Sequence, residues 1–346
     1  MAYEIMQIRP DNRRMLSKVD ALLAQEGIRR DQSLEYICAM VDEDYQVIAT
    51  GSFFHDTLRC FAVDHRHQGE GLLNQIVSHL CEVEAQQGRL HLFLYTKPQA
   101  AKFFGDLGFC EIALVPQKLV FMENRRDGFE HYLKTLEKTR QQGRSAAVVM
   151  NANPFTLGHQ YLAETASRAC DCLHLFVVSE DASLVPAGVR KALVQAGTAH
   201  LPNVQLHDCG PYIISSATFP SYFLRDSAEV IESQARLDLA VFARIAGVLG
   251  IEERFVGEEP ASMVTGIYNR VMQEELPKFG IQCRILPRLE AQGRPISAST
   301  VRTLLQQGDF DALASLVPPS TLSYFMSSEA EPVLEALRRA GDVVHY

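Results

Sequence analysis

Short runs of β-branched and aromatic residues alternate with segments of helical apolar spacing along the first third of the chain. These two periodicities predict strands and helices respectively. Two of the strand-like runs are separated only by His55 and Asp56, which is typical of a hairpin. We therefore expect residues 1–122 to form one α+β domain containing an antiparallel meander. Its predicted strands cover 5–9, 35–41, 47–54, 57–63, 91–95 and a final run after Gly108, and its predicted helices cover 11–26, a segment ending near 87 and a segment beginning at 98.

The pattern changes in the second half to continuous apolar runs separated by helical segments. Such runs predict strands of a parallel sheet that is covered on both faces. We expect a polar linker with a bridging helix at 123–144, the helix running from 129 to about 142. Residues 145–346 should then form a Rossmann-like, doubly wound α/β domain. Its predicted strands cover 146–150, 173–178, 204–207, 254–257 and 283–286.

Composition narrows the functional classes. A chain of 346 residues is long enough for about two domains, and 47% hydrophobic content is ample for packed cores. The net charge of −9 argues against a protein that binds duplex nucleic acid. Residues 1–10 lack the features of a signal peptide, and no apolar run approaches the ~18 residues of a membrane helix. We therefore expect a cytoplasmic protein without a membrane partner.

The eight cysteines are scattered and include no closely spaced pair of the kind that binds zinc. We expect them to be reduced thiols of the core. No metal site made by the protein alone is predicted.

Candidate chemistry begins where the first strand of the second half ends, at residues 150–159. There Pro154 stiffens a loop, Gly158 permits close approach of a ligand, and His159 stands at the start of a helix. Helix N-termini favour anions because their first N–H groups have no partner within the helix. We predict a phosphate site in this loop. Further contacts are expected from Asn151, Asn153 and Phe155.

Two short segments resemble the paired signatures of the nucleotidyltransferase superfamily. Thr156-x-Gly158-His159 resembles its (H/T)-x-G-H element, and residues 296–302 resemble its I-S-S-T-x-x-R element. The resemblance implies an ATP site in which His159 and Thr156 donate hydrogen bonds near the α-phosphate. Ser299 and Thr300 offer hydroxyls at a helix start, and Arg302 offers a cationic fork to the β and γ phosphates. Ser299 could equally be a plain N-cap.

Other residues on the same strand edge have two possible roles. Arg190 and Lys191, which open a predicted helix at 189–199, could bind phosphate or form a solvated face. Gly257 and Glu258, with Glu259 beside them, could contact the base and ribose or form a surface pair. The polar and aromatic run at 213–223 is predicted to be a loop that faces the second substrate.

The first domain carries a second strand, loop and helix junction at residues 63–73. Arg66, Gln68, Gly69 and Gly71 form a glycine-lined loop whose amides could hold a pyrophosphate. This loop and the helix from 98 resemble the GCN5-related N-acetyltransferase family, and the resemblance implies a site for a CoA-like group. Phe104 stands where many of these enzymes have a tyrosine that protonates the leaving thiolate. Acetyl transfer from CoA is therefore in doubt.

Taken together, both domains and their motifs resemble the citrate lyase ligases over essentially the whole chain. The resemblance implies that ATP, with Mg²⁺, and acetate give acetyl-adenylate and pyrophosphate. The thiol of a CoA-like prosthetic group on the citrate lyase acyl carrier protein then takes the acetyl group and releases AMP. Two alternatives stay open: an adenylyltransferase acting on a phosphorylated cofactor precursor, and a nucleotide-sensing regulator without catalysis.

Overall fold

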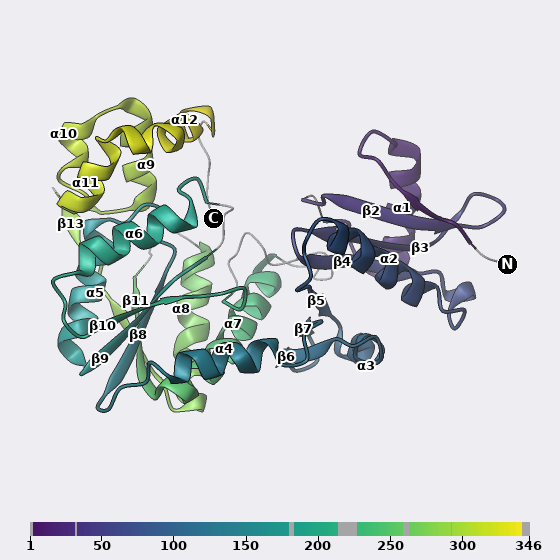
Figure 1. Cartoon of the computed structure of the whole chain (residues 1–346), viewed down its shortest axis with the longest axis horizontal. Helices are drawn as coiled ribbons and strands as arrows, with labels where there is room; N and C mark the ends of the chain where they lie inside the picture. Colours follow the sequence, from purple (N-terminus) through teal and green to yellow (C-terminus); the bar gives the residue numbers. More distant parts are fainter. Residues whose placement is uncertain are drawn as a thin grey trace. The chain divides into compact units, whose positions relative to one another are not determined.

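The computed structural model describes residues 3–31, 33–179, 183–213, 227–258, 263–291 and 293–340 (Figure 1). The chain forms two compact units, each with its own sheet and core. The first unit comprises residues 1–128 and 219–233, and the second comprises 129–218 and 234–346. Glu259 and the predicted loop at 213–223, apart from Ile213, lie outside the described residues. Among the described helices, none has the length and apolar character needed to cross a membrane.

The first unit is built on a seven-stranded sheet of order β1-β2-β3-β4-β5-β7-β6. Every neighbouring pair is antiparallel except β4 and β5. The expected α+β domain with an antiparallel meander is confirmed. The strands are β1 (Ile5–Gln7), β2 (Tyr36–Val41), β3 (Val47–Phe54), β4 (Thr57–Val63), β5 (Phe93–Thr96), β6 (Cys110–Val115) and β7 (Leu119–Glu123), and the helices are α1 (Arg13–Gln25), α2 (Leu72–Gln86) and α3 (Pro98–Asp106).

Strands β4 and β5 pair over only two residues on each strand, Thr57 with Phe93 and Leu58 with Leu94. Beyond these pairs the two strands are no longer hydrogen-bonded to one another, although both continue. The opening at this point leaves room for a cavity between strands of the same sheet. The single final strand predicted after Gly108 is in fact two strands, because the chain reverses at Pro116 and at Gln117, whose φ is 61°.

The second unit contains a five-stranded parallel sheet of order β10-β9-β8-β11-β12. The chain moves outward from β8 to one edge, then returns to build the other half from β11. This is the Rossmann-like, doubly wound arrangement; ligands of such sheets bind where the order reverses, which here is between β8 and β11. The expected fold class is confirmed. The strands are β8 (Ser145–Met150), β9 (Cys172–Val177), β10 (Val204–Asp208), β11 (Ile251–Gly257) and β12 (Gln282–Leu286).

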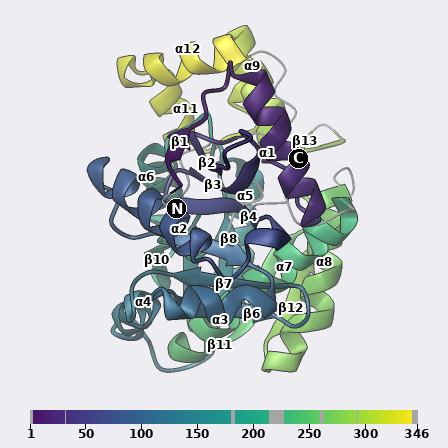
Figure 2. The ribbon, with the colours of Figure 1, turned by 90° about the vertical axis from the view of Figure 1, so that its right-hand side faces the viewer.

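Helices cover both faces of this parallel sheet (Figure 1). Figures 1 and 2 both show the C-terminal helices α9 to α12 gathered at one end of the unit. Helix α4 ends earlier than the predicted residue 142, because the amide and hydroxyl of Thr139 both bond to the carbonyl of Leu136 and close a turn. The helices are α4 (Gly128–Glu137), α5 (Leu157–Ala169), α6 (Ala187–Thr198), α7 (Ser227–Leu249), α8 (Met263–Glu275), α9 (Ala298–Gln307), α10 (Phe310–Leu313), α11 (Pro319–Phe325) and α12 (Glu331–Ala340).

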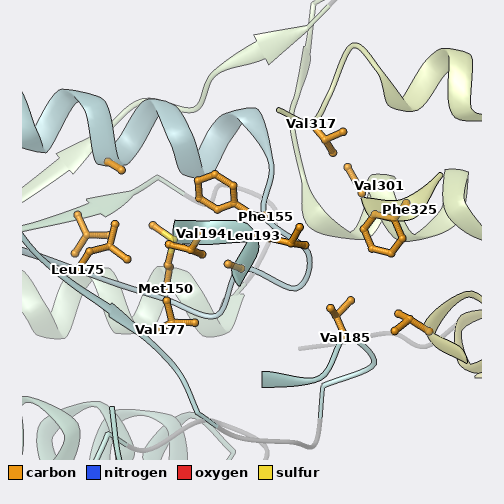
Figure 3. Close-up of a cluster of buried hydrophobic side chains, with 14 of the residues drawn as sticks. Met150, Phe155, Leu175, Val177, Val185, Leu193, Val194, Val301, Val317 and Phe325 are labelled. Atoms are coloured by element: carbon orange, nitrogen blue, oxygen red, sulfur yellow. The ribbon is translucent and has the colours of Figure 1, made fainter. Parts of the chain in front are cut away.

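One core cluster of the second unit lies against the sheet face that carries α5 and α6. Figure 3 shows side chains from β8 and β9 meeting side chains of α6 and the C-terminal helices. Phe155, in the loop after β8, belongs to this core and is fully buried. Apolar packing of Phe155 therefore fixes the loop on the core, which holds the start of α5 in place. All eight cysteines are free thiols. Five are buried, whereas Cys81, Cys110 and Cys283 are only partly buried, which differs from the core position predicted for all eight.

Candidate functional site

The first turn of α5 fixes His159 through Thr156. The Thr156 hydroxyl accepts from the amide of His159 at 3.3 Å, and the amide of Thr156 donates to His159 Nδ1 at 3.1 Å. This reciprocal pair is a capping box. A backbone N–H can only donate, so Nδ1 must be an acceptor and the imidazole proton lies on Nε2.

His159 is neutral at neutral pH. Burial, assisted by the positive charge of Arg288, lowers its pKa to about 4. Its ring also lies nearly parallel to that of Phe155, with the centroids 5.8 Å apart. A neutral imidazole with the proton on Nε2 can donate a hydrogen bond, and its other nitrogen is already occupied. His159 is therefore built as a donor and not as a general base.

Arg190 supports the loop that precedes α5. Its guanidinium is fully buried and donates to the carbonyls of Val185 and Val178 and to both the carbonyl and the side chain of Asn151. This position differs from the phosphate contact expected from sequence. Lys191 lies on the exposed side of α6 and pairs with Asp208 at 2.7 Å.

The side chains of two other loop residues, Phe155 and Asn153, also have structural contacts. Phe155 packs against α6 at Gly197, where an added Cβ would overlap the ring, with Cδ1 2.8 Å away and Cε1 closer still. A direct contact of Phe155 with ATP, as expected from sequence, does not fit this burial. The Asn153 side chain accepts from the amide of Val185 at 3.1 Å, which ties the loop to the segment before α6.

A cluster of hydroxyls marks the start of α9. Ser297, and not Ser299, is its N-cap, because the Ser297 hydroxyl accepts from the amide of Thr300 at 3.0 Å. Ser299 and Thr300 are exposed, and their hydroxyls lie 2.9 and 2.8 Å from that of Ser297. Three hydroxyls at a helix N-terminus can together donate to an anion.

The two motif segments meet in space although they are far apart in sequence. Arg302 donates to the carbonyl of Asn153 at 2.7 Å, across 149 positions. Its side chain is buried, and this burial lowers its pKa. A Cβ added to Gly158 would lie 3.6 Å from the carbonyl oxygen of Ile296, so the start of α5 packs closely on the segment before α9. The predicted pairing of the segments is thus present, with Arg302 placed at their contact.

The end of β11 completes this edge of the sheet. Gly257 and Glu258 are exposed there, and Asn269 of α8 donates to the Gly257 carbonyl at 3.2 Å. Sequence reasoning missed Arg288, which donates through Nε to the Glu258 carbonyl at 2.9 Å and through Nη1 to the Ile296 carbonyl at 3.5 Å. Its signal was its position just after the last predicted strand, on the carboxyl edge.

The first unit contains a cavity of about 640 Å³ where β4 and β5 separate. Gln68, Gly69 and Gly71 line it together with apolar residues. Gly69 and Gly71 have φ values of 87° and 77°, which only glycine adopts readily. Gly71 caps α2 without a side-chain hydrogen bond, so the amides of the first turn are offered to a ligand.

The cavity wall is apolar on the α3 side. Phe104 is buried there between Phe61 and Phe103, with both ring centroids 5.3 Å away. Arg66, expected to bind the CoA-like group, is not among the described residues that line the cavity. Its guanidinium makes two bonds to Asp64, at 2.9 and 3.1 Å, and is 65% exposed.

These observations define an enzyme-like chain of two parts. An α+β unit with a glycine-lined cavity is joined to a Rossmann-like α/β unit with two helix N-termini at its switch point. The chain belongs to the citrate lyase ligase family, and is thus an enzyme of the ligase kind. Residues 145–325 match the family described as "Citrate lyase ligase C-terminal domain".

Full-length similarity supports the same assignment. The chain is 42% identical to a [citrate [pro-3S]-lyase] ligase of Klebsiella pneumoniae, over 89% of this chain and 92% of that protein. It is 39% identical to the ligase of the same name from Haemophilus influenzae, over 89% of this chain and 94% of that one. A solved GNAT-family acetyltransferase of Staphylococcus aureus Mu50 matches 36% of this chain and 100% of its own, with 14% identity and a TM-score of 0.31.

Proposed function

We propose that this chain activates acetate with ATP and passes the acetyl group to a thiol on citrate lyase. The observation that carries the proposal is the neutral His159, with its proton on Nε2, at the start of α5, which packs on the segment just before the hydroxyls of α9. The names of the relatives support citrate lyase as the partner.

In the first step an oxygen of acetate attacks the α-phosphorus of ATP. The bond from that phosphorus to the bridging oxygen breaks, so that acetyl-adenylate forms and pyrophosphate leaves. Acetate is already an anion, so no base is required, which agrees with an imidazole that only donates. His159 would stabilise charge that grows on the α-phosphate, and the α9 hydroxyls would hold the outer phosphates.

Mg²⁺ fits this site as a companion of ATP. The ion keeps several waters and usually binds through substrate phosphates, where it would neutralise part of their charge. Within the described ranges, no group of three or more His, Cys, Asp and Glu side chains is arranged to hold a metal alone. The hydroxyls of Ser299 and Thr300 are the groups of this chain that could face a phosphate-bound ion.

In the second step the carrier's thiolate attacks the acetyl carbonyl, and AMP leaves. We propose that the cavity of the first unit binds the CoA-like arm of the carrier protein. The amides around Gly69 and Gly71 suit a pyrophosphate, and the phenylalanine-lined wall suits an alkyl chain. Phe104 has no hydroxyl with which to protonate a leaving thiolate, which favours binding of the arm over acetyl transfer from CoA.

Acetate-dependent exchange of labelled pyrophosphate into ATP tests the first step. The wild-type chain should catalyse it, and His159→Ala should lower the rate about 100- to 1,000-fold, as for other preorganised donors. His200→Gln is the matched control, because His200 is exposed and pairs with Glu164 away from the loop.

Absence of exchange in the wild type would contradict acetate activation. Release of pyrophosphate with a phosphorylated cofactor precursor would then indicate an adenylyltransferase. Binding of ATP without turnover, even with acetate and thiol present, would indicate a regulator.

Two substitutions at Gly69 test the role of the cavity. Gly69→Glu should impair acetylation of the carrier protein and leave pyrophosphate exchange intact, because its carboxylate would repel a pyrophosphate. Gly69→Ala shares the unfavourable positive φ but adds no charge, so it separates backbone strain from repulsion. Normal carrier acetylation by the folded Gly69→Glu variant would exclude the cavity as the arm site.

A further inference from the structure

Three arginines lie near the carboxyl edge of the parallel sheet, where the ATP site is proposed, and they differ in burial. Arg190 and Arg302 are both buried, and each donates to main-chain carbonyls of the loop after β8. Arg288 lies in the connection between β12 and α9 and is only partly buried. Two of these guanidiniums therefore lie beneath the loop, and the third lies at the open edge.

The contacts of Arg288 hold its guanidinium between the elements that form the site. One bond goes to the carbonyl of Glu258 at the end of β11, and a longer one goes to Ile296 just before α9. Ile296 in turn packs on Gly158 at the start of α5. Arg288 is also close enough to His159 to affect its protonation. A cation fixed here lies next to the donor that faces the α-phosphate.

We infer that Arg288 is the arginine that binds the phosphates of ATP, and that Arg302 is a positioning residue for the loop. This inference rests on the proposed function of the same site. An arginine can place two parallel N–H groups on phosphate oxygens, which lysine cannot do. Both arginines hold main-chain carbonyls, but Arg302 is buried whereas Arg288 is only partly buried, so substituting Arg302 should disturb the loop and the fold together.

Pyrophosphate exchange and ATP affinity, measured with Mg²⁺, test the inference in the full chain. Arg288→Ala should lower kcat/KM for ATP about 100-fold with an unchanged melting temperature, and Arg288→Lys about tenfold. Added guanidinium chloride, at millimolar concentration, should restore part of the Arg288→Ala activity, whereas sodium chloride should not. Arg284→Ala is the control, because Arg284 lies earlier on β12 and pairs with Glu253 on the surface. Arg302→Ala should instead lower the melting temperature.

Full activity in Arg288→Ala would overturn the inference about Arg288. The proposed function would still stand in that case, because it depends on exchange by the wild type. If Arg288→Ala does not fold, Arg288→Lys decides: a tenfold loss supports phosphate contact, and wild-type activity excludes it. If the wild type shows no exchange, the proposed function fails, and the role of Arg288 is then decided by the affinity for ATP alone. A dissociation constant raised at least tenfold in the variant then supports Arg288, and an unchanged one overturns it.

Discussion

At the scale of single residues, Thr156 decides which nitrogen of His159 carries the proton, and it does so without needing to contact a substrate. The amide of Thr156 occupies Nδ1, and the helix cap that results fixes the ring. Burial then keeps the imidazole neutral. A histidine whose free nitrogen carries the proton stabilises negative charge without moving a proton, as phosphate chemistry at an anionic nucleophile requires.

The pH dependence of pyrophosphate exchange follows from this arrangement. The pKa of His159 is lowered to about 4, so the ring gains a proton only as the pH falls through that value. Between pH 5 and 8 the rate should show no inflection that His159→Gln removes. The profile of the wild type, measured with saturating ATP and acetate, checks this, with His200→Gln for comparison. An inflection near pH 6.5 that disappears in His159→Gln would show that the residue titrates during catalysis.

At the site, sequence patterns predict a donor better than the side chains that support it. The prediction for His159 rests on a local pattern, a histidine beside glycine at a strand-to-helix junction, whereas Thr156, also predicted to donate near the α-phosphate, is the buried N-cap of α5. The burial of Arg190 and Phe155 depends on α6, which packs on them from further along the chain, so no local pattern could show it. Arg288 was missed although its position just after the last predicted strand, on the carboxyl edge, was a local signal.

At the scale of elements, the contact between α6 and the loop after β8 keeps the start of α5 in place. Phe155 fills the space that Gly197 leaves, and Gln160 of α5 donates to the Gly197 carbonyl at 2.7 Å. The missing side chain of Gly197 thus allows α6 to pack closely on Phe155 and α5, although the backbone of Gly197 does not have a positive φ. The loop geometry should depend on this one missing side chain.

Gly197→Ala should therefore destabilise the chain by about 1–3 kcal/mol, the usual cost of overpacking a core. The new methyl group overlaps the Phe155 ring, so the loss should be accompanied by weaker pyrophosphate exchange. Adding Phe155→Leu should recover part of the stability, because the smaller side chain leaves room. Urea denaturation of the two single variants and the double variant measures this coupling. Gly266→Ala, on α8 where a Cβ meets nothing, is the control.

Most elements were predictable because their periodicity is local. All five strands of the parallel sheet were predicted, each starting within about three residues of its place. Ligand binding beyond their carboxyl ends stays a prediction. The early end of α4 was not predicted, since it depends on one residue, Thr139, whose amide and hydroxyl both bond to the Leu136 carbonyl. The last strand of the first unit was predicted as one instead of two, because the turn at Gln117 requires an unusual φ that its sequence does not announce.

At the scale of the whole molecule, each unit carries buried polar groups that its proposed site does not use. In the second unit His174 and His207 form a buried pair on neighbouring strands, with His174 Nδ1 2.9 Å from His207 Nε2. Cys172 lies 3.6 Å from the other nitrogen of His174. Residues inside a parallel sheet are otherwise apolar, so this pair makes the stability of the unit depend on protonation.

Acid should weaken the fold through these histidines. Burial lowers the pKa of both His174 and His207 to about 4, whereas an unfolded histidine titrates near 6.5. Between these values the unfolded chain binds more protons, so the stability that is full above pH 6.5 is lost as the pH falls toward 4. Each histidine can contribute a slope of up to about 1.4 kcal/mol per pH unit.

Replacing both histidines of the pair with glutamine, which does not titrate, should make the free energy of unfolding less dependent on pH between 7 and 5. His131→Gln, an exposed position on α4, should leave the dependence unchanged. Urea denaturation at several pH values measures this, and circular dichroism is the suitable signal because the chain has no tryptophan. Since the chain has two compact units, each transition must be assigned separately. An undiminished slope in the double variant would place the acid sensitivity elsewhere, with His159, whose pKa is also lowered to about 4, as the next histidine to replace.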